Sequence, residues 1–470
     1  MKYLLKKSAY FRKYDNIGYL LNLIVAKDEV VDEIGALFLS QLGYEPKDID
    51  EIVNNLLNVL DGVEAETLKK DVIAFYDRLI EDGFLVKDDK NVAESYSTFI
   101  ERAKFNDNKN TDITTGEFMY KFYEKHPHVV GLHIEIINKC NERCIHCYIP
   151  HEKKNDQISK ELMFRVLDEC KALGTLSLTF SGGEPMLHPN FCEFLKKAKD
   201  MDFSVSVLTN LTLLNDEIIK MLAYRHPTCV GVSVYSMCPE IHDAITTLRG
   251  SHAKTISNIL KLLENNIPVR INCVVMKQNK DSFSEVIKWG QEHKCSVTVD
   301  YALSARTDGT TDNLNNRLSK NEMKEVVKKH IETDVNLKAS LNRVTEIQEE
   351  DDDERVCGVG LSMLAMNSNG DVYPCVGWEK YLCGNLHNMT LQEIWDSSPR
   401  IKFLRKLRMK DFTECKGCVD KEFCHFCVSS NSNEDPNGDI FNIPQITCDT
   451  AKIRHKVIEE YRKKLIVDSK

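Results

Sequence analysis

The chain has 470 residues, enough for roughly two to four domains with hydrophobic cores of their own. Acidic side chains outnumber basic ones by 72 to 62, and the net charge of −10 argues against nucleic acid or an anionic membrane as a partner. Because the sequence has neither an apolar signal segment nor a run of about 18 uncharged apolar residues, we expect a cytoplasmic protein without membrane spans.

The first part of the chain predicts a small mixed domain. Residues 10–26 are expected to form short strands broken at Gly18, and residues 28–42 a helix with apolar side chains at helical spacing. A second helix would begin with Pro46 in its first turn, and a third would end at Gly83 before a closing strand. Strands, three helices and a strand are typical of a winged helix. The acidic side chains of the third helix argue against DNA binding.

This segment, about residues 10–86, resembles the PqqD-like domains that bind the leader peptides of ribosomally made precursor peptides. The resemblance lies in GYLLNL, DEIGALFL and DVIAFYDRLIEDGFLV. It implies that a leader peptide docks as an added strand at the sheet edge next to the third helix. The alternative is a domain that serves only dimerisation or packing.

From Gly131 onward the pattern changes to alternating strands and helices. Parallel strands with right-handed crossovers of this size form a sheet that curls into a barrel or most of one. In such barrels the chemistry lies at the carboxyl ends of the strands. The six predicted strands are GLHIEIIN, TLSLTF, FSVSVLTN, CVGVSVYS, VRINCVVM and SVTVDYAL.

The first strand is followed by CNERCIHCY, which contains Cys140, Cys144 and Cys147. In a chain without disulfides such a trio indicates metal binding. Three thiolates hold three irons of a [4Fe-4S] cluster and leave the fourth open. Zinc would need a fourth ligand, for which His146 is the local candidate, and the three-residue first gap does not fit the usual CxxC pairs of zinc sites.

The CxxxCxxC signature followed by an aromatic residue, with SGGEP after the next strand, resembles radical S-adenosylmethionine (SAM) enzymes. The resemblance implies a partial (β/α)6 barrel in which the amino and carboxylate groups of SAM chelate the open iron. It also implies a SAM-derived 5'-deoxyadenosyl radical that abstracts hydrogen from the substrate. Arg249 is either a partner of the SAM carboxylate or a surface charge. The other implied SAM contacts are Tyr148 on the adenine side, Gly182, Gly183, Glu184 and Pro185 at the methionine end, Thr209 and Asn210 after strand three, and Ser233 at strand four.

The C-terminal part contains eight cysteines between Cys357 and Cys448. A zinc ribbon would use four and leave the others without a role. Seven of them resemble the SPASM extension, which holds two auxiliary [4Fe-4S] clusters and would bring the total to three. By position, the outer cluster would be held by Cys415, Cys418, Cys424 and Cys448, and the inner one by Cys357, Cys375 and Cys427.

The inner set lacks a fourth ligand, because no cysteine stands shortly before Cys357. The gap between Cys424 and Cys427 is one residue shorter than usual in the SPASM family, which makes Cys427 the least certain ligand. Cys383 could complete the set, but a buried structural thiol is the simpler interpretation. We therefore expect a substrate cysteine at the open iron, since a thiolate is a natural ligand there.

The predicted enzyme forms thioether links in a precursor peptide, as in sactipeptide and ranthipeptide maturases, with a flavodoxin- or ferredoxin-type electron donor. Carbon-carbon crosslinking, sulfatase-type formylglycine formation and a non-enzymatic iron-sulfur regulator are the alternatives. The expected architecture is α/β with six parts: recognition domain 1–94, linker 95–128, barrel 129–315, bridging region 316–356, SPASM domain 357–450 and C-terminal helix 451–470.

Overall fold

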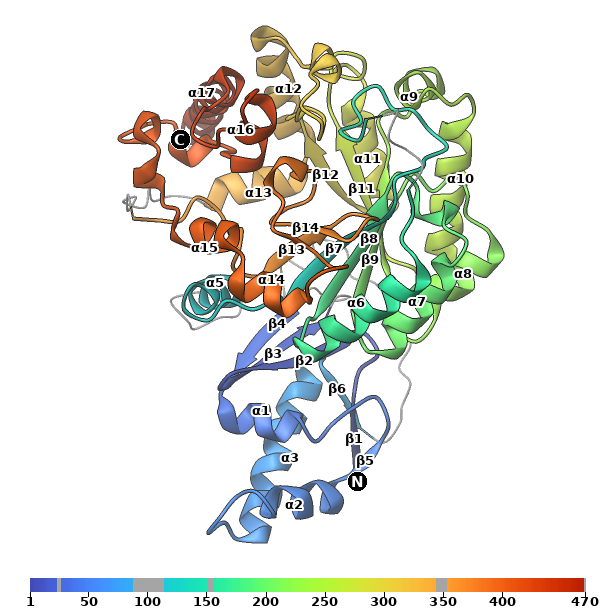
Figure 1. The fold of residues 1–470 in the computed structure, drawn as a ribbon, viewed down its shortest axis with the longest axis vertical. Coiled ribbons are helices and arrows are strands. Elements are labelled where there is room, and N and C mark those ends of the chain that lie inside the picture. The colour runs from blue at the N-terminus through green and yellow to red at the C-terminus, as the bar shows by residue number, and fades with distance from the viewer. Residues whose placement is uncertain (23–26, 88–113, 151–155, 344–352, 469–470) are drawn as a thin grey trace.

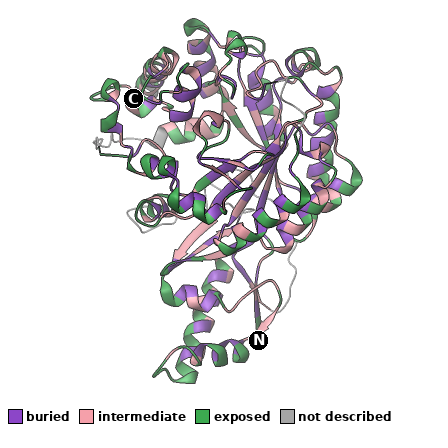
Figure 2. Ribbon diagram, viewed as in Figure 1, coloured by how far each residue is buried: buried purple, intermediate pink, exposed green. Residues whose placement is uncertain are grey.

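The computed structural model describes residues 1–22, 27–87, 114–150, 156–343 and 353–468. An N-terminal domain lies at one end of a central barrel, and the C-terminal region packs along the side of that barrel (Figure 1). Buried residues are concentrated on the central strands and on the helix faces turned toward them (Figure 2). No helix in the described part of the chain is long and apolar enough to cross a membrane.

The N-terminal domain contains two three-stranded antiparallel sheets, in the orders β5-β1-β6 and β2-β3-β4. Three helices cover them and close a separate hydrophobic core. The strands are β1 Lys2–Leu5, β2 Ala9–Tyr14, β3 Ile17–Asn22, β4 Lys27–Val31, β5 Lys47–Asp48 and β6 Leu85–Lys87, and the helices are α1 Glu33–Leu39, α2 Ile49–Leu57 and α3 Ala65–Glu81.

Three predictions for this domain were wrong in detail. Gly18 does not break a strand but lies inside β3, where a Cβ atom would come within 2.8 Å of the Val31 side chain. The helix predicted for 28–42 is shorter, because β4 pairs with β3 and Asp32 caps α1. The second helix begins after Asp48, whose side chain accepts from an amide of the first turn, and Pro46 lies outside it.

The predicted partial barrel is confirmed. Six parallel strands lie side by side in chain order, β7 to β12, with helices on their outer face. Ser159 and Asn215 cap α6 and α8 by accepting backbone amides. The strands are β7 Gly131–Ile137, β8 Ser177–Gly182, β9 Ser204–Thr209, β10 Cys229–Ser233, β11 Val269–Val274 and β12 Ser296–Asp300; the helices are α6 Lys160–Ala172, α7 Phe191–Asp200, α8 Asp216–Ala223, α9 Pro239–Thr246, α10 Ser251–Glu264 and α11 Phe283–Glu292.

The C-terminal region extends the same sheet beyond β7. Strand β13 (Met363–Met366) pairs in parallel with β7, and β14 (Asp371–Tyr373) and β15 (Gly384–Asn385) follow antiparallel. This pairing fixes the cysteines near β14 relative to the barrel. The helices of this part are α12 Lys320–Thr333, α13 Val335–Arg343, α14 Leu391–Ser397, α15 Pro399–Lys406, α16 Val428–Glu434 and α17 Gln445–Asp468.

Two predicted segments differ from the structure. The linker over 95–128 is partly helical: α5 (Thr115–Lys125) packs Met119 and Tyr123 against the N-terminal sheet, and residues 88–113 lie outside the described part. The terminal helix was expected from residue 451 but begins at Gln445, so that Cys448 stands in its first turn.

The N-terminal domain docks on the floor of the barrel, at the amino ends of the strands. Arg12 of β2 donates to the backbone oxygens of Thr175 (3.1 Å) and Asp202 (2.6 Å), just before β8 and β9. A ring nitrogen of His226 lies 2.6 Å from the Lys7 oxygen. The carboxyl ends of the strands therefore lie at the opposite end of the barrel.

Candidate active site and cluster-binding sites

The cysteine loop and the SGGEP segment are held together by backbone contacts. The amide of Gly183 donates to the Ile137 oxygen at 2.7 Å, and that of Glu184 to the Lys139 oxygen at 2.9 Å. A Cβ atom on Gly182 or Gly183 would collide with these same carbonyl groups, and Gly182 has a φ of 128°. The glycines thus permit β8 to end directly against the segment that leads into Cys140.

The three predicted cluster thiols share one half-buried neighbourhood. Burial raises the pKa of Cys144 well above its usual value, and Glu142 and the other two cysteines raise it further. The Cys140 sulfur accepts from the Glu142 amide at 3.4 Å and from Asn210 Nδ2 at 3.8 Å. Such mutual destabilisation of thiolates is relieved when a cationic iron centre binds them.

Glu184 is fully buried and links two strand ends. Its carboxylate accepts from Thr209 Oγ1 at 2.8 Å, the Asn210 amide at 2.9 Å and the Met186 amide at 3.0 Å. Burial raises its pKa to about 7, against the lowering effect of these donors. The carboxylate therefore positions Thr209 and Asn210 at the end of the barrel formed by the carboxyl ends of the strands, which we call the mouth. Its role toward the SAM ammonium group stays a prediction.

Ser233 ends β10, and its hydroxyl interacts with the buried Tyr235, whose pKa is raised first by burial and then by Cys144. The Tyr235 ring packs edge-on against His146 at 4.9 Å between centroids. Sequence reasoning missed Tyr235, although it lies two residues after Ser233. Arg249 is exposed in the turn between α9 and α10.

Tyr148 is anchored to the first barrel strand. Its hydroxyl donates to Glu135 Oε1 at 2.8 Å, and its ring lies 3.5 Å from where a Cβ of Gly377 would stand. Burial, partly offset by this hydrogen bond, raises the pKa of Glu135 to about 7. Sequence reasoning missed Glu135, which stands in no recognisable motif of β7.

A segment after β12 holds the cysteine loop from outside. Arg306 Nη1 donates to the Cys147 oxygen at 2.7 Å, Asn313 Nδ2 to the His146 oxygen at 3.3 Å and Asn316 Nδ2 to the Ile145 oxygen at 3.2 Å. Arg306 is itself fixed by two 2.8 Å contacts with Asp312. We call Arg306, Asn313 and Asn316 the loop bracket. Three consecutive carbonyl groups of the cysteine loop are thereby held by side chains from this segment.

The outer cysteine set lines one cavity of about 460 Å³. Burial raises the pKa of Cys424 to about 11, and the other three thiols of the set add to this. The cavity has room for a cluster and brings together residues far apart in sequence. The set consists of Cys415, Cys418, Cys424 and Cys448.

The inner cysteine set is Cys357, Cys375 and Cys427. Burial raises the pKa of Cys375 to about 11, and the neighbouring Cys427 and Cys357 thiols contribute. Cys375 lies two residues before Gly377, which adjoins Tyr148, so this set borders the cysteine loop of the barrel. Cys383 is buried in the barrel core cluster and lies near Ser398 instead.

Both sets, like the first trio, suit iron-sulfur clusters by donor chemistry, since thiolates are the usual cluster ligands. Among the described residues, no three or more His, Cys, Asp or Glu side chains close around a single metal ion. The assignment of iron-sulfur clusters to these sites therefore rests on the sulfur donors and on the way neighbouring thiols raise one another's pKa. For the outer set it also rests on the enclosing cavity.

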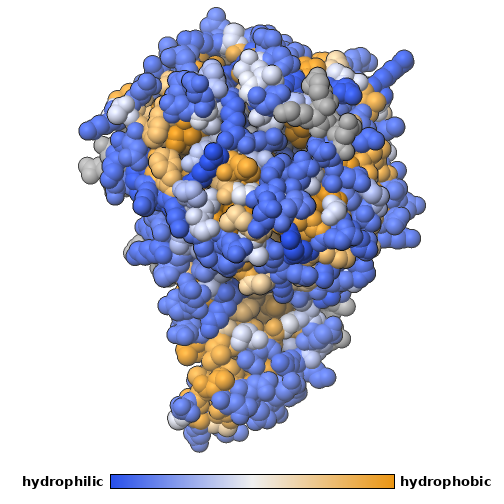
Figure 3. All heavy atoms as spheres, in the orientation of Figure 1, coloured by the Kyte–Doolittle hydropathy of each residue, from blue (hydrophilic) through white to orange (hydrophobic). Residues whose placement is uncertain are grey.

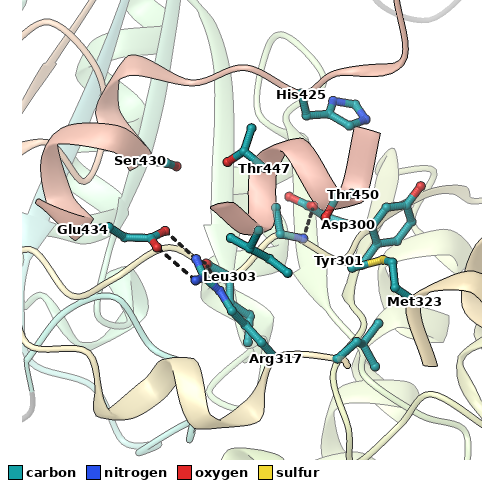
Figure 4. Close-up of a pocket in the computed structure, with 13 residues that line it drawn as sticks. Asp300, Tyr301, Leu303, Arg317, Met323, His425, Ser430, Glu434, Thr447 and Thr450 are labelled. Atoms are coloured by element: carbon teal, nitrogen blue, oxygen red, sulfur yellow. Dashed lines mark hydrogen bonds and ion pairs between the residues drawn. The ribbon is translucent and has the colours of Figure 1, made fainter. Parts of the chain in front are cut away.

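A small cavity of about 60 Å³ lies where the barrel meets α16 and α17 (Figure 4). Arg317 spans it and donates to both carboxylate oxygens of Glu434, with 2.9 Å between Nη1 and Oε2. Asp300 at the end of β12 and Thr447 also line it. The volume accommodates water rather than a peptide side chain. The ion pair fastens the C-terminal region to the barrel.

Three family profiles match the chain in the regions that contain the N-terminal domain, the barrel and the C-terminal cysteines. The radical SAM superfamily matches residues 134–290, the iron-sulfur cluster-binding SPASM domain residues 357–419, and the domain of coenzyme PQQ synthesis protein D (PqqD) residues 28–85. The chain belongs to the radical SAM/SPASM peptide maturases with a PqqD-like domain.

This radical SAM/SPASM maturase is similar to proteins of several activities. The AdoMet-dependent heme synthase of Methanosarcina barkeri is 25% identical, over 62% of this chain and 89% of that protein. The antilisterial bacteriocin subtilosin biosynthesis protein AlbA of Bacillus subtilis is 25% identical, over 64% of this chain and 67% of AlbA. Streptococcus suis SuiB bound to precursor peptide SuiA has a similar fold, with a TM-score of 0.63 at 18% identity, covering 94% of this chain and 99% of SuiB.

Proposed function

We propose that this maturase forms thioether bonds between cysteine sulfurs and acceptor carbons of a ribosomally made precursor peptide. The observation that carries the proposal is the inner cysteine set, which has three members and borders the cysteine loop through Gly377 and Tyr148. A site with one place left for an outside ligand, next to the place where SAM is expected, suits a substrate thiol.

The N-terminal domain would bind the leader of the precursor. Strand β4 forms one end of its sheet, and Arg78 of α3 contacts Glu29 of β4 at 2.6 Å, so the sheet edge runs beside the third helix. An extended peptide can add to such an edge through backbone hydrogen bonds. Apolar side chains gather on the same domain (Figure 3). Ile34 at the start of α1 has an exposed fraction of 48%.

The residues proposed to hold the cofactors are those predicted from the sequence. When bound, SAM and the clusters supply one-electron chemistry and a hydrogen-abstracting 5'-deoxyadenosyl group. A cytoplasmic flavodoxin or ferredoxin would deliver the electron. The proposed ligands are Cys140, Cys144 and Cys147 in the barrel, the outer set of four cysteines and the inner set of three; the proposed SAM contacts are Tyr148, Gly182 to Pro185, Thr209, Asn210, Ser233 and Arg249.

The reaction balances as a net loss of two hydrogens. One S–H and one C–H bond break, and one S–C bond forms. The hydrogen atom from carbon would be taken by the 5'-deoxyadenosyl group that SAM supplies, giving 5'-deoxyadenosine; the thiol proton would go to solvent, and an auxiliary cluster would supply the acceptor for the remaining electron. The protein holds the thiol and the acceptor carbon together, which is its main contribution to the rate.

The test is co-expression with a small cysteine-containing peptide encoded beside this protein, followed by thiol alkylation and high-resolution mass spectrometry. The proposal predicts a loss of two hydrogens for each cysteine that resists alkylation. An equal mass loss with every cysteine alkylated would contradict it and indicate carbon-carbon crosslinking. A cysteine or serine converted to an aldehyde would indicate formylglycine formation, against which the leader-binding type of N-terminal domain argues.

A further inference from the structure

Arg355 is a buried cation that borders both cysteine sets of the C-terminal region. Its exposed fraction is 6%, and it stands two residues before Cys357 of the inner set. It also lines the 460 Å³ cavity of the outer set. Burial raises the pKa of the Cys357 thiol, and Arg355 is among the groups that lower it. The guanidinium group and this thiol therefore lie within electrostatic range of each other.

Two of the three guanidinium nitrogens of Arg355 are used within the protein. Nη1 donates to the Arg405 oxygen, and Nη2 donates to the Leu404 oxygen at 3.1 Å and to the Val359 oxygen at 3.4 Å. These carbonyl groups fix the plane of the side chain. The third nitrogen, Nε, is buried and has no hydrogen-bond partner in the described part of the chain. Because a buried N–H group without an acceptor is costly, an acceptor is expected beside it.

No carboxylate forms an ion pair with Arg355 among the residues that the structure describes. Asp353 and Glu354, which precede it, form ion pairs with lysines instead. Glu124 of α5 influences Arg355 electrostatically but does not contact it. A buried guanidinium group stays charged, so it needs an anionic neighbour to offset its loss of hydration.

Two further arginines add to the positive charge around Arg355. Arg408 faces it across an isolated antiparallel bridge and, after burial, is the strongest influence that lowers the pKa of Arg355. Arg405 lies with its guanidinium group over the Trp395 ring at 4.3 Å, and its Nη2 atom is buried without a partner among the described residues. An iron-sulfur cluster held by thiolates carries net negative charge, and its sulfur atoms accept hydrogen bonds. It would supply both the missing charge and the missing acceptor.

The position of Arg355 has a consequence for electron transfer. Taking up an electron makes a cluster more negative, so a nearby fixed cation and an N–H group directed at sulfur stabilise the reduced form more than the oxidised form. Both effects raise the reduction potential. They are strong at this place because the side chain is buried in a region of low dielectric constant.

We propose that Arg355 donates its Nε–H to a sulfur atom of the inner cluster site and raises the reduction potential of the cluster held there. This inference rests on the proposed function, because the cluster concerned is the acceptor for the one electron that remains when the S–C bond has formed and the thiol proton has left. Arg355 acts through the cluster and not on the peptide, so it is a positioning residue.

The test is an anaerobic redox titration of the full-length enzyme with its clusters, followed by electron paramagnetic resonance and carried out without peptide. Wild type, R355Q, R355K and R400Q are compared after their iron contents have been measured. The signal that changes in C427A identifies the inner cluster. Arg400 is exposed on α15, the helix that ends beside Arg355, so R400Q is the matched control that removes the same charge from the surface.

We expect R355Q to shift the reduction equilibrium of the inner cluster at least about tenfold toward the oxidised form, which is a fall of about 59 mV for one electron. R400Q should have the potential of the wild type. R355K should lie between them, because its ammonium group keeps the charge but is drawn to the three carbonyl groups and leaves the sulfur without a fixed donor.

An unchanged potential in R355Q, or an equal shift in R400Q, would overturn the inference. If R355Q binds less iron than the wild type, R355K decides the matter, and a potential equal to that of the wild type would then overturn the inference. Because no peptide is present, the result does not depend on the product. An enzyme with the expected potentials that forms no thioether would refute the proposed function alone.

Discussion

At the scale of single residues, the site contains one fully buried and one half-buried carboxylate, with different tasks. Glu184 is paired with three donors and positions the end of β9. Glu135 has one donor, Tyr148, and the pKa of its carboxyl is raised by burial and by Glu379. The sequence identified the first through its motif and gave no comparable signal for the second.

We predict that Glu135 makes stability fall with rising pH. Its pKa is raised from 4.5 to about 7, so the folded protein keeps a proton that the unfolded chain releases. Stability is therefore lost between pH 4.5 and 7, by about 3 kcal/mol at most, and is constant above that range. Thermal unfolding of the anaerobic protein should show a smaller decline in E135Q than in the wild type, because the part that belongs to Glu184, whose pKa is also raised to about 7, remains. Parallel pH profiles would contradict the assignment.

We also predict that G183A fails to retain the barrel cluster. A Cβ there collides with the Lys139 carbonyl and comes within 2.6 Å of the Asn138 oxygen, which shifts the segment that leads into Cys140. Iron analysis of the purified protein should show the loss of one cluster. G43A, at a glycine with open space for a Cβ, is the control for a glycine substitution outside the mouth, and equal iron contents in both variants would count against this role.

At the scale of elements, the barrel could be predicted almost completely. The strands alternate between apolar and polar residues, and α6 and α8 have side-chain caps; both signals are local. The element boundaries of the N-terminal domain were harder to predict. Pro46 suggests a helix start and Gly18 a strand break, and tertiary packing overrides both. The loop bracket could not be predicted, since Arg306 and Asn313 contact the cysteine loop from about 160 residues away.

We predict that R306K weakens the barrel cluster selectively. Lysine cannot bind Asp312 with two parallel contacts and the Cys147 oxygen with a third, so the loop loses its outer support. Electron paramagnetic resonance with SAM should show a reduced signal from the SAM-binding cluster, with the auxiliary signals retained. R317K, which alters the Glu434 pair of Figure 4, is the control; an equal loss there would mean a general effect on folding.

At the scale of the whole molecule, the N-terminal PqqD-like domain and the carboxyl ends of the barrel strands lie at opposite ends of the barrel (Figure 1). Under the proposed function, a precursor whose leader is bound by this domain would extend along the barrel before its core reaches the mouth. The docking contacts of Arg12 and His226 fix this geometry, and residues 88–113 between the domains lie outside the described part.

We predict that R12A loosens the N-terminal domain from the barrel floor. The substitution removes the two hydrogen bonds to the Thr175 and Asp202 oxygens. Amide hydrogen exchange in β2 and at the start of β8 should become about tenfold faster. R78A, which changes a contact within the N-terminal domain, should leave exchange at β8 unchanged. Unchanged exchange in R12A would mean that the docking depends on other contacts.

In the proposed function, the inner cysteine set leaves a place for a substrate sulfur. The most direct measurement is selenium X-ray absorption on the anaerobic complex with a precursor whose cysteine is replaced by selenocysteine. We predict an iron neighbour at selenium in addition to carbon, and its loss in C427A, which removes a proposed ligand of the inner set without supplying another. Selenium surrounded by carbon alone, in an enzyme that still forms the thioether, would contradict the account.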